Sequence, residues 1–130
     1  MNSTTLTQFA PRMLSILRIM AALLFMAHGT MKLLGFPASE MVPPVGSMGW
    51  IAGVLELVGG ALLTVGFLTR PTAFVLSGLM AAAYFIAHAP QSVFPVLNGG
   101  DAAILYCFVF LYFVFAGPGP WSVDAAQDRA

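Results

Sequence analysis

Two long stretches without a charged side chain constrain the fold of this chain more than any other feature. Residues 71–100 and residues 102–123 contain no Asp, Glu, Lys or Arg. A soluble domain carries about a quarter charged residues, whereas this chain of 130 residues is 8% charged and 59% hydrophobic. A chain this small cannot bury so much apolar surface in one soluble core. The sequence therefore predicts an integral membrane protein that contacts the lipid bilayer.

The composition also argues against several classes of function. The formal net charge is zero and no basic cluster is present, which argues against nucleic-acid binding. Cys107 is the single cysteine, so an internal disulfide, a dithiol redox pair and a thiolate zinc site are excluded. The chain lacks a glycine-rich phosphate loop and a GxSxG motif, so a nucleotide enzyme or a serine hydrolase has no support.

Four apolar segments are long enough to cross the hydrocarbon core, which takes about twenty residues. They cover residues 13–34, 47–68, 72–89 and 98–116, and a tail follows at 117–130. The first segment is too long for a signal peptide and contains Arg18 and Lys32, so we expect it to remain in the mature protein. Short connections favour antiparallel neighbours. The expected fold is all-α, a single polytopic membrane domain over residues 1–130 that forms an up-down bundle of four transmembrane helices.

The distribution of basic residues predicts the topology. Arg12, Arg18, Arg70 and Arg129 fall on one side of the predicted membrane, and Lys32 alone falls on the other. Because positively charged residues favour the cytoplasmic side, we expect both termini to be cytoplasmic. The expected location is the plasma (inner) membrane.

Each predicted span carries a stripe of polar or small residues at helical spacing, which we expect to face the centre of the bundle. The stripes are Arg18, Phe25, His28 and Lys32; Gly53, Glu56, Gly59 and Gly60; Ser77, Ala81, Tyr84 and His88; and Asp101, Leu105, Phe108 and Tyr112. Ionisable groups within a span are costly and mark functional sites by default. The stripes therefore indicate a polar interior.

The helical rise of 1.5 Å per residue places several of these groups at one depth. Glu56, Tyr84, His28, His88 and Asp101 fall in one layer of the outer half of the membrane, whereas Arg18 lies about 10 Å nearer the inner surface than Glu56. We therefore expect Glu56 to contact His28 and interpret these two as the catalytic pair. The expected ligand-binding residues are Tyr84, His88, Asp101, Lys32 and Asn98.

Structural interpretations of the same residues stay open. Glu56 can be a protonated or paired packing residue. Lys32 can neutralise the C-terminus of the first helix, and Asp101 the N-terminus of the fourth. His28 and His88 are at similar depth on the first and third spans, so a bis-histidine haem is a minor alternative. No other metal site is expected.

Several short motifs run in order along nearly the whole chain. They are His28-Gly29, Lys32-Leu33, Gly35-Phe36, Glu56, Gly59-Gly60, Gly66, Thr69-Arg70, His88, Asn98-Gly99-Gly100-Asp101, Leu105-Tyr106, Gly117-Pro118-Gly119, Ser122 and Asp124. In these motifs the chain resembles the DoxX family of small four-helix membrane proteins. Asp101 stands where many members of that family carry Glu.

The resemblance implies a redox-associated role. The namesake group of the family is similar to a subunit of a thiosulfate:quinone oxidoreductase, and other members are linked to thiol and oxidative-stress pathways. The first hypothesis is therefore a membrane subunit that binds a quinone or a similar apolar molecule in a polar intramembrane pocket. Because the chain has no dithiol, a redox partner subunit would bring the electrons.

The alternative hypothesis is a non-enzymatic assembly factor, chaperone or scaffold in the membrane. In that case the polar layer fixes the register of the helices, and the function lies in contacts with a protein partner. A small-solute transporter has less support, because the sequence shows no inverted repeat. A homo-oligomer is compatible with either hypothesis.

Overall fold

The computed structural model describes residues 2–128, so Arg129, one of the predicted topology residues, lies outside the described residues. The four long helices are α1 (Ser3–Leu34), α2 (Met48–Val65), α3 (Thr69–Ala83) and α5 (Asp101–Ala116). Shorter elements are the π-helix η1 (Tyr84–His88), the 3-10 helix η2 (Ala89–Gln91), α4 (Pro95–Asn98) and α6 (Val123–Ala126). No strand occurs in this part of the chain.

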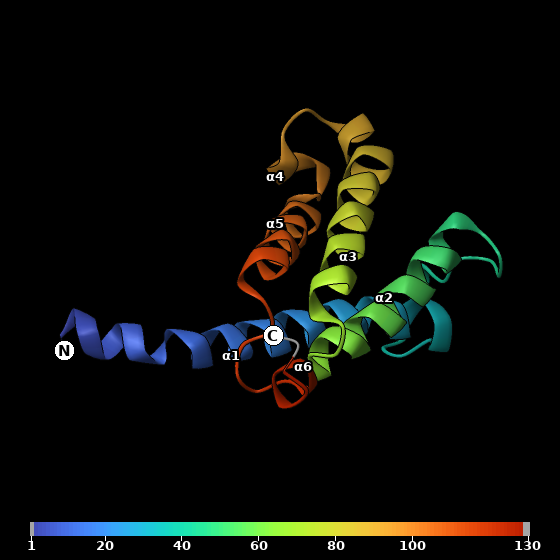
Figure 1. Cartoon of the computed structure of the whole chain (residues 1–130). Helices are drawn as coiled ribbons and strands as arrows, with labels where there is room; N and C mark the ends of the chain where they lie inside the picture. The colour runs from blue at the N-terminus through green and yellow to red at the C-terminus, as the bar shows by residue number, and fades with distance from the viewer. Residues whose placement is uncertain (1, 129–130) are drawn as a thin grey trace.

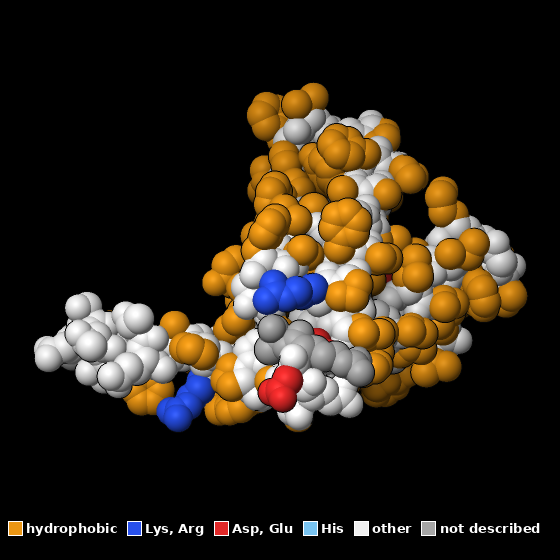
Figure 2. Space-filling view, viewed as in Figure 1, with side chains coloured by type: hydrophobic (Ala, Val, Ile, Leu, Met, Phe, Trp, Pro, Cys, Tyr) orange, Lys and Arg blue, Asp and Glu red, His pale blue; other side chains and the backbone are white. Residues whose placement is uncertain are grey.

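The helices confirm the predicted fold class of a small polytopic helical membrane protein. Three helices are long and apolar enough to cross a membrane, namely Ser3–Leu34, Met48–Val65 and Thr69–Gln91, and α5 is a shorter apolar helix of 16 residues. Figure 2 shows apolar side chains over most of the visible surface of α2, α3 and α5, whereas few cover the N-terminal end of α1. The side of the membrane on which each terminus lies stays a prediction.

Helix α1 begins earlier than the apolar pattern predicts, at Ser3 rather than at residue 13. The prediction counted only residues suited to hydrocarbon, but a helix can continue into water beyond the membrane. Pro11 lies inside this extension, where it removes one backbone hydrogen bond. The extension projects away from the other helices (Figure 1), and its residues up to Met13 are exposed.

The long helices pack as two antiparallel pairs, α1 with α2 and α3 with α5, with a smaller interface between α2 and α3. Figure 1 shows that the α3–α5 pair rises away from α1 rather than running alongside it. Small residues bring α1 and α2 together, as the predicted stripe requires. A Cβ atom at Gly29 would lie 2.5 Å from the Leu57 backbone nitrogen, and one at Gly60 would lie 2.8 Å from Met26 Cβ.

The apolar core lies where α3 and α5 meet α1. Phe110 and Phe113 of α5 are fully buried, and the ring of Phe110 packs edge-on against Phe25 of α1 at 4.9 Å. The buried face of α3 includes Leu76 and Ser77, and Ser77 Oγ donates a hydrogen bond of 2.8 Å to the Cys107 carbonyl oxygen. This face overlaps the stripe predicted for the third span.

The inward face predicted for the fourth span is wrong. Leu105, Phe108 and Tyr112 are 65%, 65% and 56% exposed, and Asp101 is also exposed. The buried residues of α5 are Ala103, Phe110 and Phe113. Helix α5 is apolar on every side, so the spacing of its residues does not indicate which face packs against the other helices. The prediction placed Asp101 on the inward face, and this choice was wrong.

Candidate functional site

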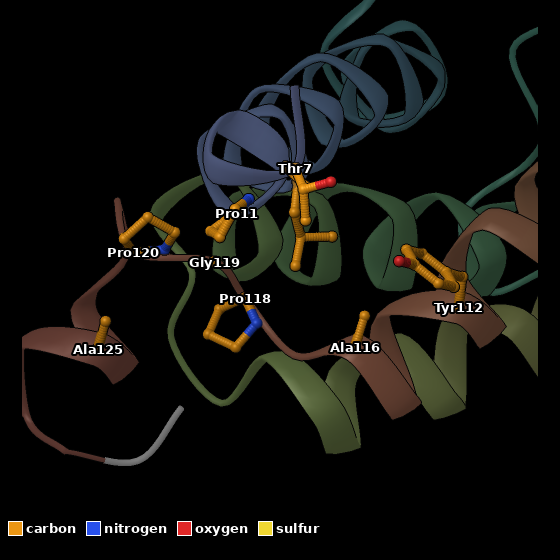
Figure 3. Close-up of a pocket in the computed structure, with 10 residues that line it drawn as sticks. Thr7, Pro11, Tyr112, Ala116, Pro118, Gly119, Pro120 and Ala125 are labelled. Carbon is orange, nitrogen blue, oxygen red and sulfur yellow. The ribbon is translucent and has the colours of Figure 1, made fainter. Parts of the chain in front are cut away.

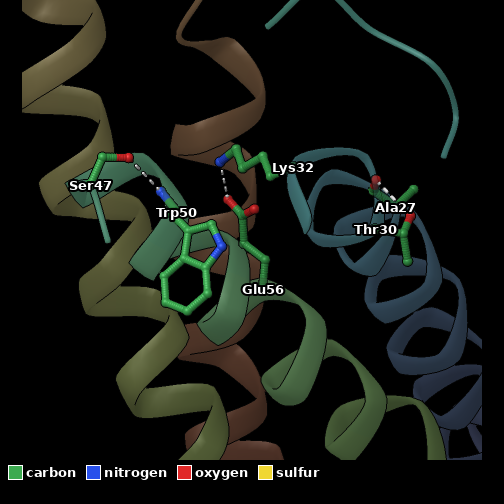
Figure 4. Close-up of polar contacts among 6 residues, drawn as sticks. All are labelled: Ala27, Thr30, Lys32, Ser47, Trp50 and Glu56. Atoms are coloured by element: carbon green, nitrogen blue, oxygen red, sulfur yellow. Dashed lines mark hydrogen bonds and ion pairs between the residues drawn. The ribbon is translucent and has the colours of Figure 1, made fainter. Parts of the chain in front are cut away.

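An ion pair joins α1 and α2 in the layer that the sequence predicts for the outer half of the membrane. Lys32 Nζ of α1 lies 2.8 Å from Glu56 Oε1 of α2, and the two side chains are 23% and 5% exposed. Figure 4 shows the Lys32 ammonium pointing at the Glu56 carboxylate. Within residues 2–128, the second carboxylate oxygen, Glu56 Oε2, is buried and has no hydrogen-bond partner.

An unpartnered oxygen on a buried carboxylate is unusual, because leaving it unsatisfied costs about 1–3 kcal/mol or more. Close packing of the two helices explains how Glu56 comes to be buried. Gly53 lies one turn before Glu56 on α2, and a Cβ atom at Gly53 would lie 3.0 Å from Lys32 Cβ. The glycine lets the two backbones approach until the long Lys32 side chain reaches the carboxylate.

The expected contact between Glu56 and His28 is replaced by the contact with Lys32. His28 is exposed, and its ring packs edge-on against Tyr106 of α5 with 6.3 Å between the ring centroids. The depth estimate treated each side chain as level with its own Cα atom. Helical side chains lean back over the preceding turn, so the Lys32 ammonium reaches the depth of Glu56, where His28 was expected.

A second polar cluster closes the connection between α3 and α5. Asn98 Nδ2 donates to the Tyr84 hydroxyl oxygen at 3.2 Å and to the Ser92 carbonyl oxygen at 3.0 Å, and Asn98 Oδ1 accepts from the Gly100 backbone N–H at 2.8 Å. His88 Nδ1 lies 2.9 Å from the Asn98 carbonyl oxygen. Because a carbonyl only accepts, His88 Nδ1 is the donor in this hydrogen bond and carries a proton.

The single polar layer predicted from depth is thus two separate groups. Glu56 and Lys32 lie between α1 and α2, with His28 on the same face of α1. Tyr84, His88 and Asn98 lie at the far end of α3, and Asp101 is exposed in the first turn of α5. No hydrogen bond or ion pair found within residues 2–128 joins the two groups.

The two histidines have different neighbours, which gives no support to a haem held between them. His28 contacts Tyr106, whereas His88 contacts Asn98 and stacks loosely on Tyr84 with 6.5 Å between the centroids. The described residues also contain no group of three or more His, Cys, Asp or Glu side chains placed to hold a metal ion.

Arg18 forms the densest polar cluster, at the end of the molecule that carries α6. Its side chain is fully buried, and Nε donates to the Leu63 carbonyl oxygen at 2.8 Å. Nη2 donates to the Trp121 carbonyl oxygen at 2.7 Å, and Nη1 donates to that of Pro118. Arg18 therefore fastens the segment after α5 to the end of α2, away from Glu56 as its predicted depth required.

Asp124 links the same segment to α3. Its carboxylate accepts hydrogen bonds from the backbone N–H groups of Leu68 at 2.9 Å and Thr69 at 2.8 Å. Helix α3 has no side-chain cap from Leu68, the residue before it, so Asp124 supplies that cap from a distant part of the sequence. At the same end of the α3–α5 pair, Arg70 donates to the Val114 and Phe115 carbonyl oxygens of α5 at 2.7 and 2.8 Å.

Sequence analysis missed this cluster. The sequence indicates Arg70 as a topology residue and both Arg70 and Asp124 as parts of the family motifs, but no pattern in it predicts their contacts. A usable signal was present in Ser122, which starts α6 as its N-cap and accepts from the Ala125 N–H at 3.0 Å. Ser followed by an acidic residue is typical of a helix start, which indicates an ordered segment rather than a free tail.

The surface formed by the described residues includes two grooves whose linings contain neither Glu56 nor Lys32. The α1–α5 groove, of about 460 Å³, lies between the N-terminal part of α1, the end of α5 and residues 118–120. Figure 3 shows Pro11 and Thr7 on one side of it and Tyr112, Ala116 and Pro118 on the other. The α2–α3 groove, of about 270 Å³, is lined almost entirely by apolar side chains.

The fold and the buried ion pair define a small polytopic helical membrane protein with a polar site between its first two long helices. Residues 13–89, more than half of the chain, match the model of the DoxX family. The chain therefore belongs to the DoxX family.

Two relatives match almost end to end. An uncharacterized protein of Haemophilus influenzae is 45% identical over 126 residues, which cover 92% of this chain and 93% of the relative. The inner membrane protein YqjF of Escherichia coli is 28% identical over 120 residues, covering 88% of this chain and 91% of the relative. No solved structure matches the chain significantly.

Proposed function

We propose that this protein is a redox-associated membrane subunit in which the Glu56–Lys32 pair binds the head group of a quinone or a similar apolar molecule. The observation that supports this most directly is the buried, unpartnered Oε2 of Glu56. A quinone is dissolved in the bilayer, accepts hydrogen bonds at its carbonyl oxygens and takes up protons when it is reduced. A partly buried ammonium beside an unpartnered carboxyl oxygen fits such a head group.

Each residue of the pair has a distinct role in this proposal. A lysine ammonium has three N–H donors, and Lys32 uses one on Glu56 Oε1, so it can donate another to a carbonyl oxygen. Glu56 Oε2 donates a proton when the carboxyl is protonated and accepts one when it is ionised. His28 lies one turn before Lys32 on α1, and in this proposal its imidazole relays protons to the pair.

The second cluster has a supporting role in the proposal. Asn98 joins the backbone of the connection to Tyr84, and His88 holds the Asn98 carbonyl. We assign Tyr84, His88, Asn98 and Asp101 to shaping the connection between α3 and α5 rather than to direct contact with the head group. This narrows the ligand-binding set expected from the sequence to Lys32, with Glu56 and His28.

A partner subunit completes the proposal. The chain has one cysteine, so it has no dithiol with which to pass electrons, and a redox partner would supply them. The basic residues at the α6 end, Arg12, Arg18 and Arg70, favour cytoplasmic termini. The relative named as an inner membrane protein of Escherichia coli supports the same membrane for this chain.

The test is an equilibrium titration of the purified full-length protein with decylubiquinone. Lys32→Met removes a charged hydrogen bond, which is worth about 1.5–3 kcal/mol, so we expect the affinity to fall about tenfold or more. Glu56→Gln should weaken binding less, because the amide keeps a hydrogen-bonding oxygen. Glu40→Gln, in an exposed loop position, is the matched control. Equal affinity in Lys32→Met, Glu56→Gln and the wild type would remove the pair from the site.

A second candidate function is a non-enzymatic assembly factor or scaffold. The observation in its favour is that, among the described residues, the linings of the α1–α5 and α2–α3 grooves do not include Glu56 or Lys32. Purification after mild extraction distinguishes the two functions. A stable protein partner, recovered together with a failure to bind decylubiquinone, would favour the scaffold.

A further inference from the structure

The α2–α3 groove is a wedge that opens sideways out of the molecule. Helices α2 and α3 are joined by a tight turn at Gly66, whose φ is 70°, and they diverge from that turn (Figure 1). The groove between them has a volume of about 270 Å³. Among the described residues that line it, none is charged and Thr72 alone has a polar side chain.

The groove is closed on the side toward the centre of the molecule and open on the side toward its surface. A Cβ atom at Gly59 would lie 2.7 Å from Leu76 Cδ2, so the two helices touch there. Val58 on the α2 wall and Val75 on the α3 wall are each 54% exposed. In a protein whose helices cross a membrane, that open edge faces the acyl chains of the lipid.

The wedge lies next to the residue that carries the unpartnered oxygen. On a helix, residues three and four positions apart lie on one side, one turn or about 5 Å from each other. Gly59, three residues after Glu56, faces Leu76 of α3, whereas Gly60, four residues after it, faces Met26 of α1. Glu56 therefore stands one turn along α2 from the wedge, between the side that faces α1 and the side that faces α3.

We propose that the α2–α3 groove holds the apolar tail of the molecule whose head group binds Glu56 and Lys32, an inference that rests on the function proposed above. The groove is smaller than the roughly 300–1,000 Å³ that encloses a whole drug-sized ligand, as suits part of a tail. Its apolar walls match a hydrocarbon chain. Its open edge lets such a molecule enter from the bilayer without first crossing water.

The experiment compares two quinones with the same head group on the full-length protein, decylubiquinone and the dimethoxy-methyl-benzoquinone that lacks the decyl tail. Val75→Trp fills the groove with an indole. Because the tail then loses many small dispersion contacts, we expect the affinity for decylubiquinone to fall about tenfold and that for the tail-less quinone to stay unchanged. Phe74→Trp, at a neighbouring position that is 65% exposed and outside the groove, is the matched control.

Val58→Trp fills the groove from the opposite wall and guards against a folding defect peculiar to one variant. Both groove variants should weaken decylubiquinone alone. If both quinones bind the wild type and neither groove variant changes either affinity, the tail proposal is wrong and the head-group site remains. If neither quinone binds the wild type, the proposed function itself fails. A phospholipid that co-purifies with the wild type but not with Val75→Trp, at constant decylubiquinone affinity, would assign the groove to bilayer lipid and overturn the proposal.

Discussion

The carboxylate of Asp124 should be worth several kilocalories per mole to the fold, although it lies only a few residues from the C-terminus. It is 3% exposed and accepts the backbone N–H groups of Leu68 and Thr69, the first donors of α3. It is also attracted electrostatically to the buried Arg18. Asp124→Ala removes both acceptors and the charge together.

The burial of the two donors sets the size of the effect. Thr69 is fully buried, so its N–H loses its partner without replacement, at a cost of about 1–3 kcal/mol. The hydrogen bond of the Leu68 N–H is only partly buried, so its loss costs less, about 0.5–1 kcal/mol. Together with the attraction to Arg18, we expect Asp124→Ala to lower the free energy of unfolding by about 2–4 kcal/mol. Asp124→Asn keeps one acceptor and should cost about half as much.

The single cysteine provides the assay. Cys107 is partly buried between α3 and α5 beside Ser77, so a fluorogenic maleimide reacts with it readily only after the pair opens. Thermal unfolding of the detergent-purified protein should give midpoints that fall from the wild type to Asp124→Asn and then to Asp124→Ala. Asp128→Ala, at an exposed position of the same segment, is the control. If Asp124→Ala and Asp128→Ala differ by less than about 0.5 kcal/mol, which is the usual size of surface effects, the capping argument is refuted.

Two further predictions concern the packing of α1. Gly29→Ala places a methyl group against the backbone of Leu57 and should destabilise the protein by about 1–3 kcal/mol. The control is Gly78→Ala on α3, where nothing lies within 4 Å; it should be neutral or stabilise the helix by up to about 1 kcal/mol. The thiol assay measures both variants, and equal unfolding midpoints would contradict the close approach of α1 and α2. Arg18→Lys keeps the charge but loses the planar guanidinium that reaches several carbonyl oxygens at once. We therefore expect a protease to cut the chain after residue 116 faster than in the wild type. An unchanged cleavage rate would show that Arg18 does not hold the C-terminal segment.

The sequence determined the membrane class and the faces of the first two long helices. Charge-free stretches and apolar run lengths are local properties, so they identified the helices without knowledge of their neighbours. The small-residue stripe of α2 predicted a face turned to the centre of the bundle, because small residues let helices approach closely in lipid; the structure shows that Gly53 and Gly60 of this stripe contact α1. The stripe also placed Glu56 in the interior, where the structure has it.

The partners of the polar residues were decided by the tertiary structure. The reach and lean of a long side chain brought Lys32, rather than His28, to Glu56. The face of α5 could not be read from a helix that is apolar all round, so it was set by packing against α3 and Phe25. Asp124 found its two donors 55 and 56 residues away in the sequence, and no local pattern carries that distance. Periodicity tells which residues can be buried, whereas only the folded chain tells which of them meet.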